Sequence, residues 1–126
     1  MFECKKILNG RGNVPEPEVH VASGDITAGS TLALSGGKVA INSIAPTHIA
    51  LADAASGAKV ACYAIIPGMI FDVPFASTVT NVTAKEGDKV KIDSGIAVTS
   101  NTTDGVVTIV NLNGATKAGD IIQVKF

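Results

Sequence analysis

The sequence has no tryptophan and a single tyrosine, and aromatic residues make up only 4% of its 126 residues. A surface that stacks on sugars or nucleic-acid bases depends on aromatic side chains, so the chain has few residues from which to build one. The net charge is also small, because 10 basic and 11 acidic residues leave a formal net charge of −1. Nucleic-acid binding needs a basic excess or stripe, so we expect no nucleic acid as a partner.

Long apolar runs are missing as well. The longest one extends from Val60 to Phe71 and is interrupted by Pro67 and Gly68, which predicts two strands around a turn. A membrane-spanning helix needs about 20 apolar residues. No apolar segment follows Lys5 and Lys6 in the manner of a signal peptide. We therefore expect no membrane partner and a protein that is made and retained in the cytoplasm.

Candidate catalytic and metal-binding residues are few. The chain has two cysteines, Cys4 and Cys62, and two histidines, His20 and His48. Scattered singly, they match no zinc-ligand spacing and no nucleophile motif. We expect no catalytic residue, metal or cofactor. A Cys4–Cys62 disulfide is one alternative for the cysteines, but we expect a reduced pair, with Cys62 buried as a small hydrophobe. An enzyme would instead be indicated by a pocket that brings either histidine close to Cys62 or to a carboxylate.

What the sequence does contain is apolar β-branched residues and turn formers. Hydrophobic residues make up 46% of the chain, with 13 glycines and five prolines, and this composition favours strands and tight turns. Short alternating segments between turn pairs predict eleven strands: Val19–Ala22, Thr31–Leu34, Lys38–Ile41, His48–Ala52, Lys59–Ile66, Met69–Val73, Val79–Thr83, Lys89–Asp93, Ile96–Ser100, Gly105–Val110 and Ile121–Phe126. The pattern predicts an all-β fold, a small single-domain β-barrel, β-tulip or sandwich. The segment Leu51–Gly57 could form one helical turn within it.

A short motif occurs three times and consists of a small or charged residue, glycine, a polar residue and then an alternating strand. Its copies are 27–34, 85–92 and 117–124. Glycine permits a tight turn, and the polar side chain can bond the turn backbone. We therefore expect Asp88 and Asp120 to cap turns, not to bind a metal.

Residues 1–18 differ from the rest and predict an extended N-terminal arm, with a β-barrel-like domain over residues 19–126. Coil-forming residues occupy 9–13, and the sequence from Pro15 to Glu18 favours an extended segment. Such an arm is either a frayed terminus or a segment that orders on a partner. In the second case, its contact residues would come from the aromatic, basic and proline positions Phe2, Lys5, Lys6, Arg11, Pro15 and Pro17.

Over residues 19–126 the chain resembles the head-decoration, or capsid cement, proteins of tailed bacteriophages. The points of similarity are 21–29 before a strand, Gly37-Lys38-Val39, the strand, alanine-rich turn and strand of 49–60, Glu86-Gly87-Asp88-Lys89-Val90, and the closing 118–126. Many members of the family have a glycine-valine-alanine strand where this chain has His48-Ile49-Ala50-Leu51. The arm through Glu18 has no counterpart that we can match.

The resemblance implies a small β-barrel or β-tulip that docks on the outside of an expanded capsid, often as a trimer. The expected function is therefore that of a viral structural protein that decorates and stabilises a phage head. Its implied partners are the major capsid protein and further copies of itself, and its implied location is the virion surface. The alternative is a non-catalytic ligand-binding β module of a bacterial surface or phage tail-fibre protein.

Overall fold

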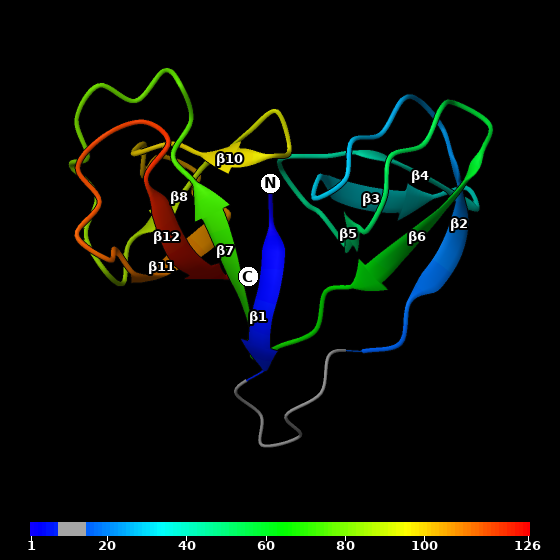
Figure 1. Ribbon diagram of the computed structural model, residues 1–126, viewed down its shortest axis with the longest axis horizontal. Helices are drawn as coiled ribbons and strands as arrows, with labels where there is room; N and C mark the ends of the chain where they lie inside the picture. Colours follow the sequence, from blue (N-terminus) through cyan, green and yellow to red (C-terminus); the bar gives the residue numbers. More distant parts are fainter. Residues whose placement is uncertain (8–14) are drawn as a thin grey trace.

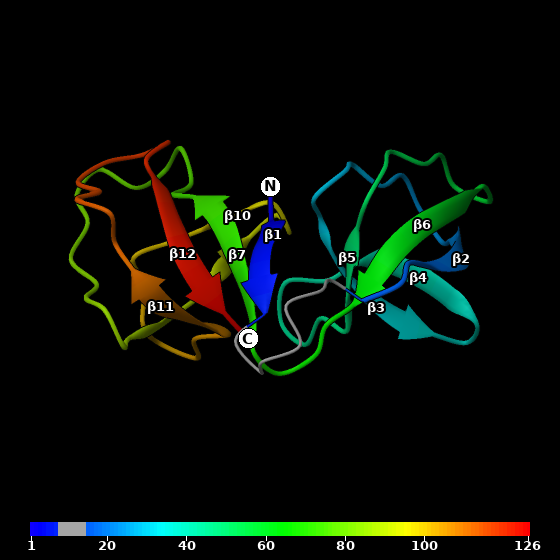
Figure 2. The same ribbon diagram turned by 60° about the horizontal axis from the view of Figure 1, so that its bottom comes forward.

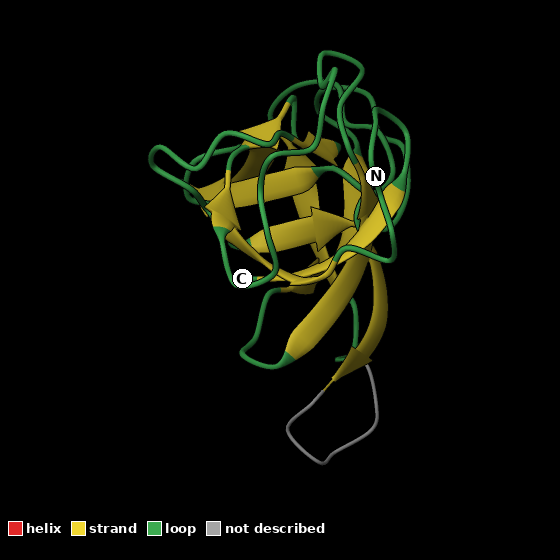
Figure 3. Cartoon of the chain, turned by 90° about the vertical axis from the view of Figure 1, so that its left-hand side faces the viewer, coloured by secondary structure: helices red, strands yellow, loops and turns green. Residues whose placement is uncertain are grey.

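The computed structural model describes residues 1–7 and 15–126. The fold is all-β: the described residues contain twelve strands and no helix, and loops connect the strands (Figure 3). The chain forms one small domain with two lobes, each built around its own core (Figure 1). The strands are β1 (Glu3–Ile7), β2 (Glu18–Ala22), β3 (Thr31–Ser35), β4 (Lys38–Ile41), β5 (His48–Ala50), β6 (Lys59–Ala64), β7 (Met69–Pro74), β8 (Lys89–Val90), β9 (Ile92–Asp93), β10 (Ala97–Val98), β11 (Val107–Asn111) and β12 (Ile121–Lys125).

The first lobe is a closed barrel in the order β2-β4-β3-β5-β6, with β6 pairing back to β2. Its strands pair antiparallel except β2 and β4, which run parallel. Alternation sends one face of every strand inward, and the enclosed core is small. It consists of Ala22, Ile26, Leu32, Val39, Ala50, Val60 and Cys62. The β-barrel predicted from the sequence is thus confirmed.

The second lobe contains a five-stranded sheet in the order β1-β7-β12-β11-β8, together with the β9–β10 pair. Strand β7 has the buried pattern of a central strand, and Phe71 and Val73 are completely inaccessible to solvent. The lobes are joined through the outer face of the barrel, where Ile49 pairs with Tyr63 and both pack on the second core. The predicted strands on either side of Pro67-Gly68 form as β6 and β7, but they belong to different lobes.

The three motif copies adopt the same turn. Gly29, Gly87 and Gly119 have φ of 79°, 90° and 83°. In each copy the N–H of the following polar residue donates to the carbonyl two positions before the glycine, at 3.0–3.3 Å. This is the geometry of a type II turn, whose third residue requires positive φ. Asp88 caps its turn by accepting from the Lys85 N–H at 2.9 Å, as expected.

Asp120 caps the third turn more strongly, because its Oδ2 accepts from the N–H groups of Thr116 and Lys117 at 2.9 and 3.2 Å. The bond from Thr116 is the main cause of a lowered pKa of the Asp120 carboxyl. A lowered folded-state pKa contributes stability that is present above the unfolded value, near 3.8, and is lost as pH falls through the folded value.

Asp120→Asn is therefore expected to lower Tm at pH 7 and at pH 5, because the amide is a weaker acceptor than the carboxylate. The difference in Tm from the parent protein should shrink as pH falls below 3.8. Thermal unfolding followed by circular dichroism across this range checks both statements. A Tm difference that stayed constant with pH would show that the carboxylate charge contributes nothing.

The expectation of an N-terminal arm is wrong for residues 1–7. Phe2 is only 3% exposed and packs its ring against Phe71 and Phe126, with centroids 6.1 and 5.7 Å away. Strand β1 pairs antiparallel with β7, so it belongs to the sheet of the second lobe. It runs along the side of that lobe that faces the barrel (Figures 1 and 2). The strand expected from Val19 begins one residue earlier, at Glu18.

The N-terminus also contacts the barrel lobe. The Phe2 N–H donates to the Gly29 carbonyl of the barrel lobe at 2.8 Å. The terminal ammonium donates to the carbonyl of Ile96, in the β9–β10 turn of the second lobe. Met1 approaches so closely that a Cβ on Gly29 would lie 2.3 Å from the Met1 Cβ. The physical reason for the correction is that Phe2 and Cys4 alternate with charged residues, so that one face of the segment packs on the second core.

Two further local predictions fail. No strand forms at 79–83 among the described residues, because the backbone there is paired by other groups. The Thr83 and Ala84 N–H groups both donate to the Ser100 hydroxyl at 2.8 Å, and the Val82 N–H donates to the Thr116 carbonyl. Residues 51–57 form turns and an isolated bridge between Ala54 and Ile26, not a helical turn.

Candidate metal centre

A carboxylate, two imidazoles and a thiol meet on the inner face of the barrel, toward one end of strands β2, β5 and β6. Glu18 and His20 are two residues apart on β2, so both point inward with Ala22 of the barrel core. Cys62 is the cross-strand partner of Glu18 and also of Ala50. His48 lies two residues before Ala50 on β5 and therefore shares the same face.

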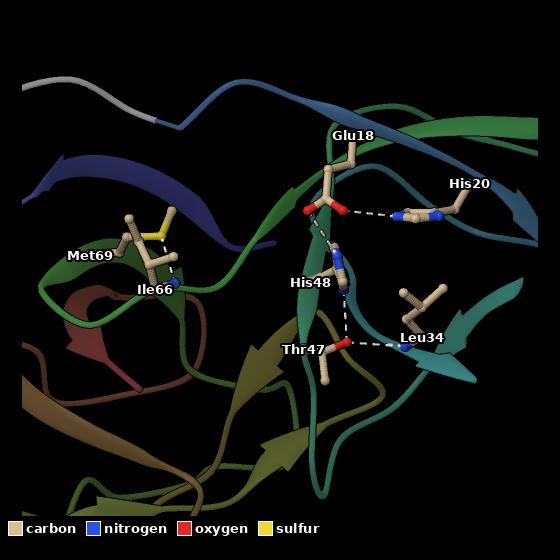
Figure 4. Close-up of polar contacts among 7 residues, drawn as sticks. All are labelled: Glu18, His20, Leu34, Thr47, His48, Ile66 and Met69. Carbon is tan, nitrogen blue, oxygen red and sulfur yellow. Dashed lines mark hydrogen bonds and ion pairs between the residues drawn. The ribbon is translucent and has the colours of Figure 1, made fainter. Parts of the chain in front are cut away.

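Glu18 holds the two imidazoles with its two carboxylate oxygens (Figure 4). Its Oε1 lies 3.1 Å from His20 Nε2, and its Oε2 lies 3.2 Å from His48 Nε2. The rings contact each other edge to face, with centroids 5.3 Å apart. Exposure of the side chains falls from 43% for Glu18 to 21% for His20 and 8% for His48, so the cluster extends from the surface into the barrel.

A second polar contact fixes the inner imidazole. Thr47 Oγ1 lies 2.7 Å from His48 Nδ1 and accepts a hydrogen bond from the Leu34 N–H at 3.0 Å (Figure 4). Because Leu34 supplies a donor, the hydroxyl proton is available for Nδ1. A neutral His48 then carries its proton on Nε2 and donates it to Glu18.

The cluster perturbs two titrating groups. The hydrogen bond from His20 lowers the pKa of the Glu18 carboxyl, and the charge and hydrogen bond of His48 add to this effect. Burial, together with the negative charge of Glu18, raises the pKa of the Cys62 thiol from 9.0 to about 11. A nucleophilic cysteine requires a lowered pKa and access to solvent, whereas Cys62 is completely buried. Both histidines thus lie close to Cys62 and to a carboxylate, which is the juxtaposition that would indicate an enzyme. A buried thiol with a raised pKa, however, does not suit thiol catalysis.

The arrangement does suit a metal ion. One donor atom from each of His20, His48 and Cys62 lies within 4.8 Å of the other two. Two imidazoles and a thiol are ligands that zinc accepts. These three residues are far apart in the sequence but lie together in the barrel, so the expectation of isolated ligands is wrong. The sequence pattern did not single out Glu18, although Glu18 and His20 have the spacing that places two side chains on one face of a strand.

Cys4, the remaining candidate, lies on β1 and packs against the core of the second lobe. Cys62 is completely buried in the barrel core of the first lobe, as expected of a small hydrophobe.

The residues predicted to contact a partner lie in different surroundings. Phe2 is buried in the second lobe and is not available to a partner. Lys5 is exposed on β1 and forms an ion pair with Glu3 at 2.9 Å, and Lys6 pairs with Ile70 in the β1–β7 ladder. Pro15 is half-buried and Pro17 is exposed just before β2. Arg11 lies outside the described residues.

Surface hollows also occur away from this cluster. One of about 590 Å³ lies between Met1, Phe75, Ile96 and their neighbours. Another, of about 310 Å³, is lined by Ser43, Ile44, Lys91, Ile92, Asp104 and Val106. A third, of about 320 Å³, is lined by Glu3, Cys4 and Tyr63 among others, and none of the three contains a histidine.

Comparison with known proteins gives no family for this chain: no protein-family model matches the sequence, and no curated protein is significantly similar to it. Among the described residues, no helix is long and apolar enough to cross a membrane.

Proposed function

We propose that the chain is a viral structural protein that binds the outer surface of a bacteriophage capsid and stabilises the expanded shell. What supports this most is the agreement between the fold and the resemblance to capsid cement proteins. That resemblance implies a small β-barrel, and the first lobe is a closed barrel. The segments that carry the resemblance form strands and tight turns, including the turns at Gly29, Gly87 and Gly119.

The surface offers apolar contacts on both lobes. Ile44, in the loop after β4, is 84% exposed, and Val19 on β2 is 60% exposed. Ile121 on β12, in the other lobe, is 48% exposed. Covering apolar surface stabilises a complex by about 25 cal/mol per Å². A capsid surface is broad enough to cover such residues, and self-association into trimers multiplies the effect of each weak contact.

Selective binding to the expanded shell would stabilise that state by mass action. The test is co-sedimentation of the purified protein with expanded and unexpanded heads of the phage that encodes it. We expect saturable binding to expanded heads only. Absence of binding to both forms would overturn the proposal and favour the ligand-binding module. Equal binding to both forms would overturn the stabilising role.

Contact by the N-terminal segment can be tested without disturbing Phe2. Lys5→Glu combined with Arg11→Glu reverses two charges near the N-terminus, and Lys38→Glu combined with Lys125→Glu is the matched control on exposed strand ends. We expect the first pair to shift half-saturation of expanded heads to higher concentration, because interface charges tune association. The control pair should leave it unchanged. Equal effects of the two pairs would exclude a specific N-terminal contact.

A further inference from the structure

We propose that Glu18, His20, His48 and Cys62 form a binding site for a divalent metal ion of the zinc class. The site lies at the open end of the barrel, and it is independent of the capsid-binding proposal. Its ligands come from β2, β5 and β6, which are neighbours around the closed barrel. A bound ion would therefore join three strands at a point where the strands end.

The distances are close to those of a coordinated ion. Donor atoms on one tetrahedral zinc ion lie roughly 3.3–3.6 Å apart, from bond lengths of about 2.0–2.3 Å. The Glu18 oxygens already lie 3.1 and 3.2 Å from the two imidazole Nε2 atoms. The widest separation among the His20, His48 and Cys62 donors is within 4.8 Å. A closure of roughly 1 Å brings these three donors onto one ion, a movement within the reach of side-chain rotation. Glu18 can add an oxygen from its position beside the two imidazoles.

The chemical type of the ligands selects the ion. A thiolate and two imidazoles favour zinc and its neighbours over magnesium and calcium, which prefer oxygen ligands. The carboxylate of Glu18 supplies the fourth ligand of a tetrahedral site. One thiolate and one carboxylate carry two negative charges, so a divalent ion leaves the site as a whole neutral, which limits the cost of burying charge at Cys62.

Thr47 holds the His48 ring in an orientation that suits metal binding. A metal-binding histidine usually donates its other ring N–H to an oxygen, which fixes the ring. Thr47 Oγ1 lies 2.7 Å from His48 Nδ1 and has a second lone pair beyond the one that accepts from Leu34. On metal binding, the His48 proton moves to Nδ1 and is donated to Thr47, and Nε2 becomes the ligand.

Proton balance follows from the ligand states. Neutral His20 and His48 each keep one proton, on the nitrogen that does not bind the ion. Glu18 is already ionised, so it releases none. The Cys62 thiol loses its proton to solvent, and the Cys62 sulfur forms the metal bond as a thiolate. Binding of one ion therefore releases one proton for each chain.

The first test uses the reduced, chelator-treated full chain titrated with cobalt(II), whose thiolate complexes have a strong charge-transfer absorption. We expect one cobalt ion per chain, a thiolate band, and displacement of cobalt by zinc. Zinc should also raise Tm, because it binds the folded state. A wild-type protein that binds no cobalt, or that binds it without a thiolate band, overturns the proposal.

The two cysteines provide a matched pair of variants. Cys62→Ser should abolish the cobalt–thiolate band, whereas Cys4→Ser should retain it. His20→Ala changes the more exposed histidine and should lower cobalt affinity at least tenfold, so it remains informative if Cys62→Ser fails to fold. Glu18→Gln should also weaken binding. A thiolate band that persists in Cys62→Ser and disappears in Cys4→Ser would place the metal elsewhere and overturn the assignment.

Discussion

Phe2→Ala is expected to lower the free energy of unfolding by about 3–5 kcal/mol, the usual cost of deleting a buried phenylalanine ring. Phe2 is 3% exposed and packs against the rings of Phe71 and Phe126, which also contact each other, in the second core. The substitution leaves a cavity beside β7, the strand that pairs with both β1 and β12. Small domains have a total stability of about 5–15 kcal/mol, so this loss is a large part of it.

Urea unfolding followed by circular dichroism measures the effect, because the chain has no tryptophan for fluorescence. Ile44→Ala, at a side chain that is 84% exposed, is the control and should change stability by no more than about 0.5 kcal/mol. If Phe2→Ala cost as little as this control, the N-terminal residues would behave as the loose arm that the sequence predicted.

Leu32→Ala is expected to destabilise the chain by about 2–5 kcal/mol. Leu32 is completely buried in the barrel core, which has only seven members and includes two alanines and a cysteine. Few neighbours can move to fill the space left by the leucine, so the cost should lie toward the upper part of this range.

Leu34→Ala is a matched control for Leu32→Ala. Both residues lie on β3 and point to the same face, but Leu34 is 38% exposed at the end of the strand. We expect it to cost less than about 1 kcal/mol by the same urea measurement. Equal losses at the two positions would contradict a closed barrel with its core at Leu32.

Most strands and turns could be predicted because their signals are local. Alternation identified β3, β4, β7 and β12, and the Gly-polar motif identified three turns with the same hydrogen bond. The strand predicted at 79–83 does not form, because the Ser100 hydroxyl accepts hydrogen bonds from backbone N–H groups at the end of this segment. The alternating pattern contains no information about such a distant side-chain partner.

The N-terminal strand and the barrel cluster were missed for a related reason. Residues 9–18 have coil-forming character, and extending that interpretation to Phe2 ignored its alternation with Glu3 and Cys4. The cluster depends on register: Glu18 faces Cys62, 44 positions along the chain, only because β2 and β6 pair as they do. A shift of one residue would send Cys62 to the opposite face.

Both the barrel and the metal site depend on the register that pairs Glu18 with Cys62, and anomalous diffraction from crystals grown with zinc tests this register. We expect one zinc peak per chain at the end of the barrel where Glu18 lies. It should lie about 2.0–2.1 Å from the Nε2 atoms of His20 and His48 and about 2.3 Å from Cys62 Sγ. A barrel in which Cys62 and His48 face different sides, or a zinc peak bound only to surface carboxylates, would contradict it.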